Sequence, residues 1–97
     1  MARLDIVNPV AVPVEYSVKP AARPRDLSNA TVGLYWNMKS GGDAALDRAE
    51  QRLSERFPGI RFRRYTGSVG FIMRHATADD ADRMASEVQA VVGTTAD

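Results

Sequence analysis

The chain has 97 residues, of which 44% are hydrophobic and 26% are charged, with a net charge of +1 at pH 7. This length suits one small domain, and the near-neutral charge argues against a protein that binds nucleic acid or an anionic membrane. The absence of cysteine excludes disulfides, thiolate metal sites and a cysteine nucleophile within this chain. No apolar run approaches the roughly 20 residues of a membrane span, and the first residues lack the apolar core of a signal peptide, so a cytoplasmic location is expected.

The first 28 residues differ from the rest because prolines recur in them without making them polar. Prolines at this density rule out a helix and a central strand, and four of the chain's five lie here, at Pro9, Pro13, Pro20 and Pro24. Apolar side chains occupy every second position from Val10 to Val18, which is typical of an extended segment with one apolar face. We therefore predict an extended Pro-rich arm at residues 1–28 and an α/β domain at residues 29–97. The arm is expected to lie on an apolar surface, which belongs either to this domain's own core or to a partner subunit.

The domain begins with an apolar strand, a polar turn and an amphipathic helix. Thr31–Trp36 has apolar residues on both faces, as a central parallel strand does. Ser40-Gly41-Gly42-Asp43 fits a capping box, with Asp43 itself as the alternative cap. The helix that follows this cap ends at Pro58-Gly59. The apolar residues of the helix recur at helical spacing, at Leu46, Ala49, Leu53 and Phe57.

Two further apolar runs and a second helix complete the domain. Ile60–Tyr65 alternates but carries three arginines, which predicts a strand at a sheet edge with solvated charges. Phe71–Met73 is too short to classify and is either a strand stub or a docking segment. Thr77-Ala-Asp-Asp80 is a second capping box that begins a helix, and Ala90–Thr95 is a third strand. The side chains that this helix turns inward are predicted to be Ala81, Met84, Ala85 and Val88.

The order of these elements predicts a small α/β fold. Right-handed crossovers between the strands give a parallel sheet in the order 2-1-3 with two helices, which is half of a doubly wound, flavodoxin-like fold. The third strand is apolar and forms an exposed edge, and one face of the sheet is expected to be poorly covered. We therefore predict that a partner chain, a second copy or a continuation completes the domain.

The turn after the first strand is the best candidate for a functional site. In open parallel sheets ligands bind where neighbouring crossovers diverge, here between the turn 37–42 and the end of the third strand at residues 94–97. Lys39 offers a positive charge and Asn37 hydrogen-bonds in either sense, so these two are the candidate catalytic residues. A solvated turn without a ligand is the alternative, because neither a P-loop nor a Gly-x-Gly-x-x-Gly motif is present. Substrate contacts are expected from Ser40, Gly41, Gly42, Thr94 and Thr95.

Other polar residues give weaker signals. His75 is the chain's only histidine, so a metal site lacks ligands, and no metal or organic cofactor is assigned. The histidine is either a surface or capping residue or a general acid/base. Asp79, Asp80 and Asp82 fall in the first turn of the second helix, where carboxylates stabilise the helix dipole and the cap.

Several short motifs together resemble the UGSC-type family, a set of thioredoxin-motif proteins named for a Sec/Cys-Gly-Ser-Cys sequence. The resemblance spans most of the chain, with the middle third poorly matched. In that family the last of these motifs leads directly to the reactive sequence, whereas this chain ends at Asp97. The motifs are Val7-Asn8-Pro9, Arg23-Pro24-x-x-Leu27, Val32-Gly33-Leu34-x-x-Asn37-x-Lys39 and Ala90-Val-Val-Gly-x-x-x-Asp97.

The resemblance leaves three explanations for the missing reactive sulfur or selenium. The chain is a natural half of a split protein, a product cut at a UGA codon that encodes selenocysteine, or a non-catalytic paralogue. The exposed strand and the apolar arm favour the first explanation and also fit the second.

These observations lead to one leading hypothesis and one alternative. The chain is expected to be the small subunit of a heteromeric enzyme related to the UGSC-type family, contributing its turn to a site shared with a partner that holds the reactive group. The alternative is a non-catalytic binding subunit that associates through its arm and exposed strand edge. Expected partners are a second protein subunit, or another copy through self-association, and a small-molecule substrate.

Overall fold

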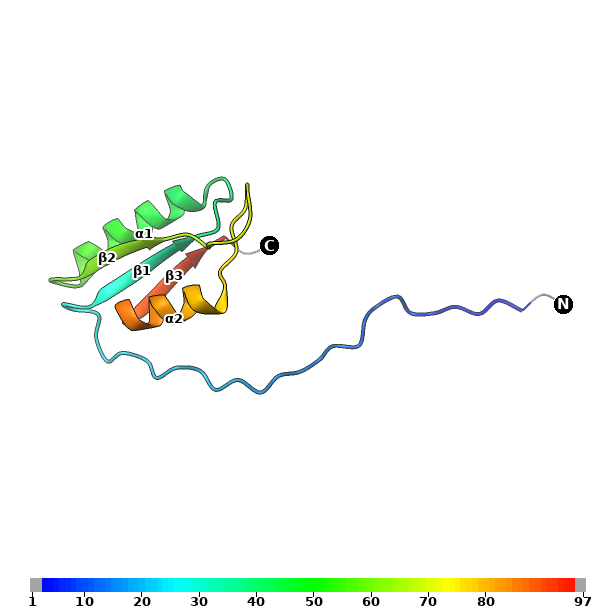
Figure 1. The fold of residues 1–97 in the computed structure, drawn as a ribbon. Helices are drawn as coiled ribbons and strands as arrows, with labels where there is room; N and C mark the ends of the chain where they lie inside the picture. Colours follow the sequence, from blue (N-terminus) through cyan, green and yellow to red (C-terminus); the bar gives the residue numbers. More distant parts are fainter. Residues whose placement is uncertain (1–2, 96–97) are drawn as a thin grey trace.

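A computed structural model describes residues 3–95, and residues 1, 2, 96 and 97 lie outside the description. The three strands are parallel and lie in the order β2-β1-β3, which confirms the predicted α/β fold and its topology. Asp97, where the family resemblance ends, is one of the residues outside the description. The elements along the chain are β1 (Thr31–Trp36), α1 (Gly42–Arg56), β2 (Arg61–Tyr65), α2 (Ala78–Glu87) and β3 (Ala90–Thr94) (Figure 1).

β1 is the central strand, which explains why both of its faces are apolar. Its residues 31–35 pair with residues 61–65 of β2, and its residues 32–36 pair with residues 90–94 of β3. Both outer strands are therefore edges of this sheet. The placement of the arginine-rich strand at an edge is confirmed.

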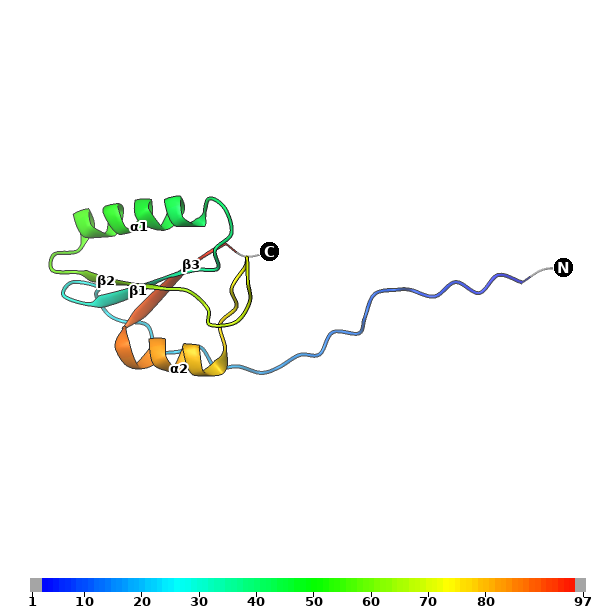
Figure 2. The same cartoon turned by 45° about the horizontal axis from the view of Figure 1, so that its top comes forward.

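The two helices lie on opposite faces of the sheet (Figure 2). The crossover from β1 to β2 and the crossover from β2 past β1 to β3 run in opposite directions across the sheet, and right-handed crossovers of opposite direction put their helices on opposite faces. On the α1 face, Leu34 and Leu46 are fully buried. On the α2 face, Tyr65 packs with Met84 and Val88. Each face thus has its own small apolar core.

The prediction that one face is poorly covered holds for the α2 face, although each face carries a helix. The bare region of this face lies at β3. Gly33 approaches both Tyr65 and Val91 on that face, yet the Val91 side chain remains 47% exposed. The α2 residues Met84 and Val88 pack on Tyr65 of β2 and leave β3 uncovered.

The helix caps follow the prediction at α2 and depart from it at α1. Thr77 and Asp80 form the reciprocal capping box that the sequence indicated. At α1 the cap residue is Gly41, with φ 91°, and no side chain caps the helix, so the predicted box of Ser40 with Asp43 is wrong. Of the side chains predicted to face inward from α2, Met84 and Val88 are buried, whereas Ala81 and Ala85 are exposed.

Each arginine of β2 has a partner at the surface. Arg64 bonds both Asp47 at 2.8 Å and Glu50 at 2.9 Å, which joins β2 to α1. Arg63 pairs with Glu87 of α2 at 2.9 Å, and Arg61 donates to the Asn29 carbonyl. The strand is therefore joined to both helices by ion pairs that are at least partly exposed.

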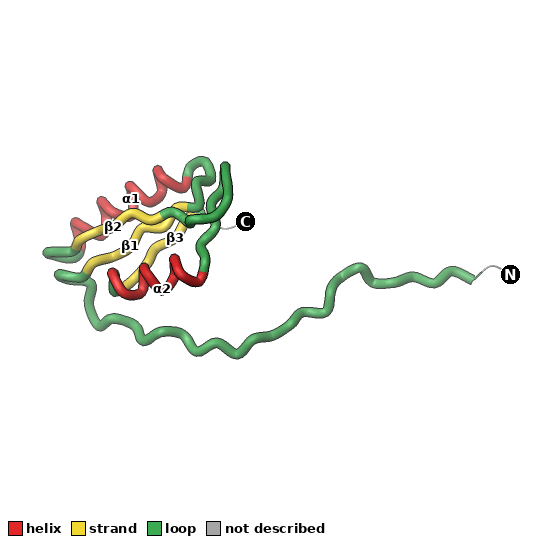
Figure 3. The backbone as a smooth tube through the Cα atoms, viewed as in Figure 1, coloured by secondary structure: helices red, strands yellow, loops and turns green. Residues whose placement is uncertain are grey.

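The arm runs away from the domain as an extended chain (Figure 3). Residues 3–26 are exposed throughout, and the molecule measures 75 × 31 × 26 Å. The interpretation that the arm covers the domain's own core is therefore wrong for this structure. Neither of the helices described within residues 3–95 has the length and apolar content that a membrane crossing requires.

Candidate functional site

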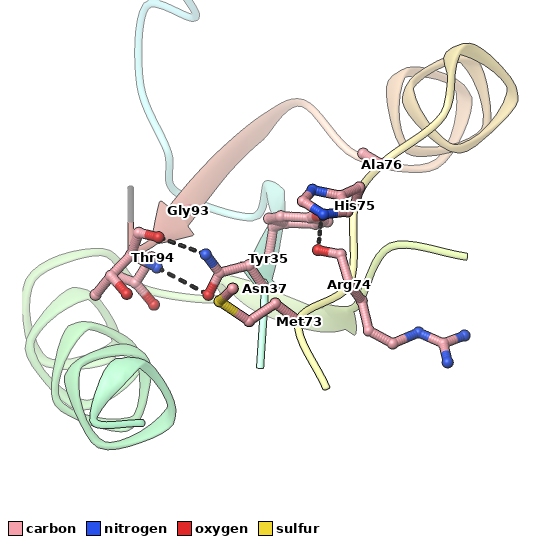
Figure 4. A pocket seen from close by; sticks show the side chains of 9 residues that line it. Tyr35, Asn37, Met73, Arg74, His75, Ala76, Gly93 and Thr94 are labelled. Atoms are coloured by element: carbon pink, nitrogen blue, oxygen red, sulfur yellow. Dashed lines mark hydrogen bonds between the residues drawn. The ribbon is translucent and has the colours of Figure 1, made fainter. Parts of the chain in front are cut away.

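A hollow of about 520 Å³ opens at the carboxyl ends of β1 and β3 (Figure 4). This volume lies within the range of small-molecule sites, and the position matches the sequence prediction. Three segments line it: the end of β1, the loop that precedes α2, and the end of β3. The lining residues are Tyr35, Asn37, Met73, Arg74, His75, Ala76, Gly93, Thr94 and Thr95.

Asn37 joins all three lining segments. Its backbone N–H donates to the Thr94 carbonyl at 3.1 Å, and its carbonyl accepts from the Arg74 N–H at 2.9 Å. Its side-chain Nδ2 donates to the Thr95 carbonyl at 2.5 Å. Its Oδ1 accepts from the backbone N–H of Lys39 at 3.0 Å and of Thr95 at 3.4 Å. Asn37 therefore positions the floor of the hollow, and its amide oxygen is already engaged.

The loop before α2 brings His75 to the hollow by folding back on itself. Val69 and His75 form an antiparallel bridge, with N···O distances of 2.7 and 3.3 Å. Gly67 permits this return, because a Cβ there would lie 2.1 Å from the His75 carbonyl carbon. The Arg74 guanidinium donates to the Gly67 carbonyl at 2.7 Å, inside the loop. The Arg74 side chain thus holds the loop together, while its backbone lines the hollow.

A buried carboxylate fixes the same loop to α2. Asp80 is 8% exposed, and its Oδ2 accepts from the Ser68 hydroxyl at 2.6 Å, the Ser68 N–H at 3.0 Å and the Thr77 N–H at 2.9 Å. These donors, the Ser68 hydroxyl first, hold the pKa of the Asp80 carboxyl far below its usual range. The base of the loop is therefore anchored at any pH near neutrality.

Tyr35 and His75 supply the ring side chains of the hollow. The Tyr35 hydroxyl donates to the Arg74 carbonyl at 3.3 Å, the bond drawn in Figure 4. This bond ties the end of β1 to the residue just before His75. The imidazole of His75 is exposed and can therefore meet a ligand in the hollow.

The predicted site residues divide into two groups. Asn37, Thr94 and Thr95 line the hollow, as the sequence indicated for neighbouring strand ends. The turn residues outside its lining are Lys39, Ser40, Gly41 and Gly42. A catalytic role for Lys39 and substrate contacts from the other three therefore remain predictions, because none of the four lines the hollow.

The turn itself is held by packing around Gly42. The Gly42 N–H donates to the Lys39 carbonyl at 3.2 Å, and Trp36 Nε1 donates to the same carbonyl at 2.7 Å. The Thr94 hydroxyl donates to the Gly42 carbonyl at 2.9 Å. A Cβ on Gly42 would lie 2.7 Å from Trp36 Cδ1. The Gly42 N–H is thus engaged within the turn rather than directed at an anion.

Sequence reasoning missed the contribution of the loop before α2 to the hollow. Tyr35, Met73 and Arg74 were not candidates, and His75 was considered only as an isolated histidine. The glycines at positions 67 and 70 were the available signal, because they allow the tight return that carries His75 back to the sheet. Within residues 3–95, no three His, Cys, Asp or Glu side chains gather as a metal centre would require.

Comparison with known proteins gives one match. A model of the UGSC family matches residues 5–97, which is nearly the whole chain. No curated protein and no solved structure matches the chain significantly.

Proposed function

The chain belongs to the UGSC family, and we propose that it is the small subunit of a heteromeric enzyme whose reactive group lies on the partner. The hollow at the ends of β1 and β3 is one half of a site that closes across the interface. Its substrate is a small polar molecule, held by the His75 side chain and by polar groups of Thr95 in the lining.

One observation carries this proposal: Asn37 fastens the ends of β1 and β3 together beside the chain's only histidine. A catalytic or binding site requires polar groups whose positions are fixed by packing and by a second layer of hydrogen bonds. Here the Asn37 amide orders Thr95, and the loop bridge orders His75. The polar groups around the hollow are therefore held in place before a ligand arrives.

An exposed apolar loop tip beside the hollow supports a shared site. Phe71 is 91% exposed, Ile72 is 74% exposed, and Met73 lines the hollow itself. Contiguous exposed apolar side chains mark surfaces that another protein covers. A partner seated on this tip also covers the open side of the hollow and excludes water from it, which strengthens electrostatic interactions inside.

His75 is the residue of this chain best suited to take part in the reaction. An imidazole exchanges a proton with a substrate near neutral pH, which contributes about 10²–10⁴-fold in rate. In this proposal His75 gives a proton to the substrate or takes one from it, and the partner supplies the group that forms or breaks the covalent bond. Asn37 is a positioning residue, since its amide contacts the backbone of Lys39 and Thr95.

The test uses the product of the adjacent reading frame as the partner. Light scattering should show a complex of the two chains. Hydrogen exchange should slow at Ile72 and Thr95, while exchange at Arg52–Arg56, at the C-terminal end of α1, is unchanged. The variant His75→Gln should lower the catalytic rate of the complex about 10²-fold or more with assembly intact. A fully active partner that neither binds this chain nor responds to it contradicts the proposal.

A second function is favoured by the exposed arm. Val12, Val14 and Tyr16 are 88%, 71% and 82% exposed, as in a segment that binds another chain. In this reading the protein is a non-catalytic subunit that assembles through its arm and the β3 edge. Unchanged activity in both His75→Gln and Lys39→Ala complexes, combined with loss of assembly in arm variants, favours this function over the first.

A further inference from the structure

On the side away from β1, the edge of β3 exposes the backbone N–H and C=O groups of two residues. The Thr94 carbonyl accepts from Asn37 and so points toward β1. Because hydrogen-bonding directions alternate along a strand, the N–H and C=O groups of Val91 and Gly93 point away from β1, to the side where the sheet has no further strand among residues 3–95. Backbone groups in such a row are a template for another strand.

The two edges of the sheet differ in how they are protected. β2 carries Arg61, Arg63 and Arg64, and charged side chains at an edge oppose the addition of another strand. β3 has the sequence Ala-Val-Val-Gly-Thr, without a charge or a proline. Strand addition is therefore directed to β3.

Residues 9–18 of the arm have the backbone that such an edge needs, because the two prolines within this stretch lie on the same side of the extended chain. Along an extended chain, alternate residues direct their N–H and C=O groups to opposite sides. Pro9 and Pro13 both fall on odd positions, so the missing N–H groups are on one side only. The even positions from Val12 to Val18 keep an unbroken row of donors and acceptors on the other side. Before this run, the Val10 N–H bonds the Asn8 side chain at 3.1 Å, which marks its start.

We propose that residues 12–18 of one copy add as an antiparallel strand to the free edge of β3 in a second copy, and that the exchange is reciprocal. The product is a two-fold dimer in which each three-stranded sheet gains a fourth strand from its partner. This inference does not rest on the proposed catalytic role.

The antiparallel direction follows from where the apolar side chains then lie. In an antiparallel pair, residues that exchange hydrogen bonds stand directly opposite each other with side chains on the same face. The even residues of the arm therefore stand opposite Val91 and Gly93, on the α2 face of the sheet. Val91 is 47% exposed on that face, and the valines of the arm cover it. A parallel arm would place its valines on the α1 face instead, because bonded residues then stand opposite Val92.

The exposed area of the chain is larger than that of a compact monomer, as expected for a chain that binds a partner. The chain exposes 8134 Å², whereas a compact monomer of 10.6 kDa exposes about 5,500 Å². The excess of roughly 2,600 Å² is well above the ~800 Å² that each partner buries in a standard interface. Because residues 3–26 are exposed and run away from their own domain (Figure 1), the arm does not cover its own β3 edge and is available to the β3 edge of a second copy.

Sedimentation velocity of the full chain and of three arm variants tests the proposal. Tyr16→Pro removes an N–H that faces β3, Tyr16→Ala removes only the ring, and Ser17→Pro removes an N–H that faces away. The wild-type chain should sediment with about twice the monomer mass at ~100 µM, since interfaces of standard size hold proteins together at such concentrations. Tyr16→Pro should weaken the dimer at least ~10-fold more than Tyr16→Ala, and Ser17→Pro should leave it within ~3-fold of wild type.

Amide hydrogen exchange locates the interface. In the dimer the N–H groups of Val91 and Gly93 should exchange slowly, and they should exchange fast in Tyr16→Pro. The N–H groups of Ala90 and Val92, which point toward β1, should be slow in both. A monomeric wild-type chain, equal effects of Tyr16→Pro and Ser17→Pro, or fast exchange at Val91 in a dimer each overturns the proposal. The variant Phe71→Ser, at the loop tip, should leave this dimer intact.

Discussion

The side-chain amide of Asn37 forms two hydrogen bonds with the backbone of Thr95: Nδ2 donates to the Thr95 carbonyl at 2.5 Å, and Oδ1 accepts from the Thr95 N–H at 3.4 Å. The two residues are 58 positions apart in the sequence, and this contact joins the end of the central strand to the end of an edge strand. The hollow beside His75 depends on that contact.

Replacing Asn37 by alanine should therefore weaken the fold as well as the site. The substitution leaves the backbone groups of Lys39 and Thr95 without their partner, and we expect the free energy of unfolding to fall by about 1–3 kcal/mol. Urea denaturation followed by the fluorescence of Trp36, the chain's only tryptophan, measures this loss. The control Asn8→Ala lies in the exposed arm and should leave the urea midpoint unchanged, and equal midpoints for all three proteins would contradict the role given to Asn37.

Position 42 should require glycine, because the side chains of Trp36 and Thr94 leave no room for a Cβ. A Cβ there would lie 2.7 Å from Trp36 Cδ1 and 2.8 Å from Thr94 Oγ1, whereas a Cβ on Gly93 would have its nearest neighbour at 3.9 Å. We expect Gly42→Ala to lower the free energy of unfolding by about 1–3 kcal/mol through overpacking. Gly93→Ala should be neutral or slightly stabilising, because glycine carries an entropy cost within a strand. Thermal unfolding of the two variants side by side decides the matter, and similar losses in both would refute it.

The ion pairs of Arg64 should contribute little. Its side chain is 44% exposed where it meets Asp47 and Glu50, so water and salt screen both pairs. We expect Arg64→Gln to reduce the free energy of unfolding by less than ~1 kcal/mol in low salt. Most of that difference should disappear in 1 M NaCl, where the Debye length is about 3 Å. A larger effect that persists in high salt would indicate that packing of the arginine stem, rather than charge, joins β2 to α1.

Asp80 should make the fold sensitive to acid. Its carboxyl has a pKa depressed below the ordinary value of 3.8, chiefly by the Ser68 hydroxyl. A depressed pKa in the folded state gives stability that is present above the unfolded pKa and is lost as the pH falls toward the folded value. The stability difference between wild type and Asp80→Asn should therefore be largest above about pH 5 and should shrink below pH 4. Guanidinium denaturation at several pH values measures it, and a difference that grows in acid would reverse the assignment.

Local patterns in the sequence were sufficient for most of the fold. The apolar run of β1 and the arginines of β2 predicted a central strand and an edge strand, and the Thr77–Asp80 box predicted the start of α2. These features depend on residues close together in the chain. The prediction failed at the α1 cap, where Gly42 packs between Trp36 and Thr94, because a contact with β3 determines that turn.

The candidate site was predictable only in part. Parallel topology indicated that the residues after β1 and β3 would meet, and Asn37, Thr94 and Thr95 do line one hollow. His75 could not be placed there, because its position depends on a loop that folds back through Gly67 and is pinned by Asp80.

The sequence by itself determined the strand order, the identity of the central strand and the extended arm, because hydrophobic period and proline spacing act locally and crossover handedness is nearly fixed. Tertiary structure alone decided that the Asn37 side chain is bound to the backbone of Lys39 and Thr95 and that His75 lines the hollow. Those outcomes depend on which backbone groups are already paired, and pairing between distant segments is settled only when the chain is folded.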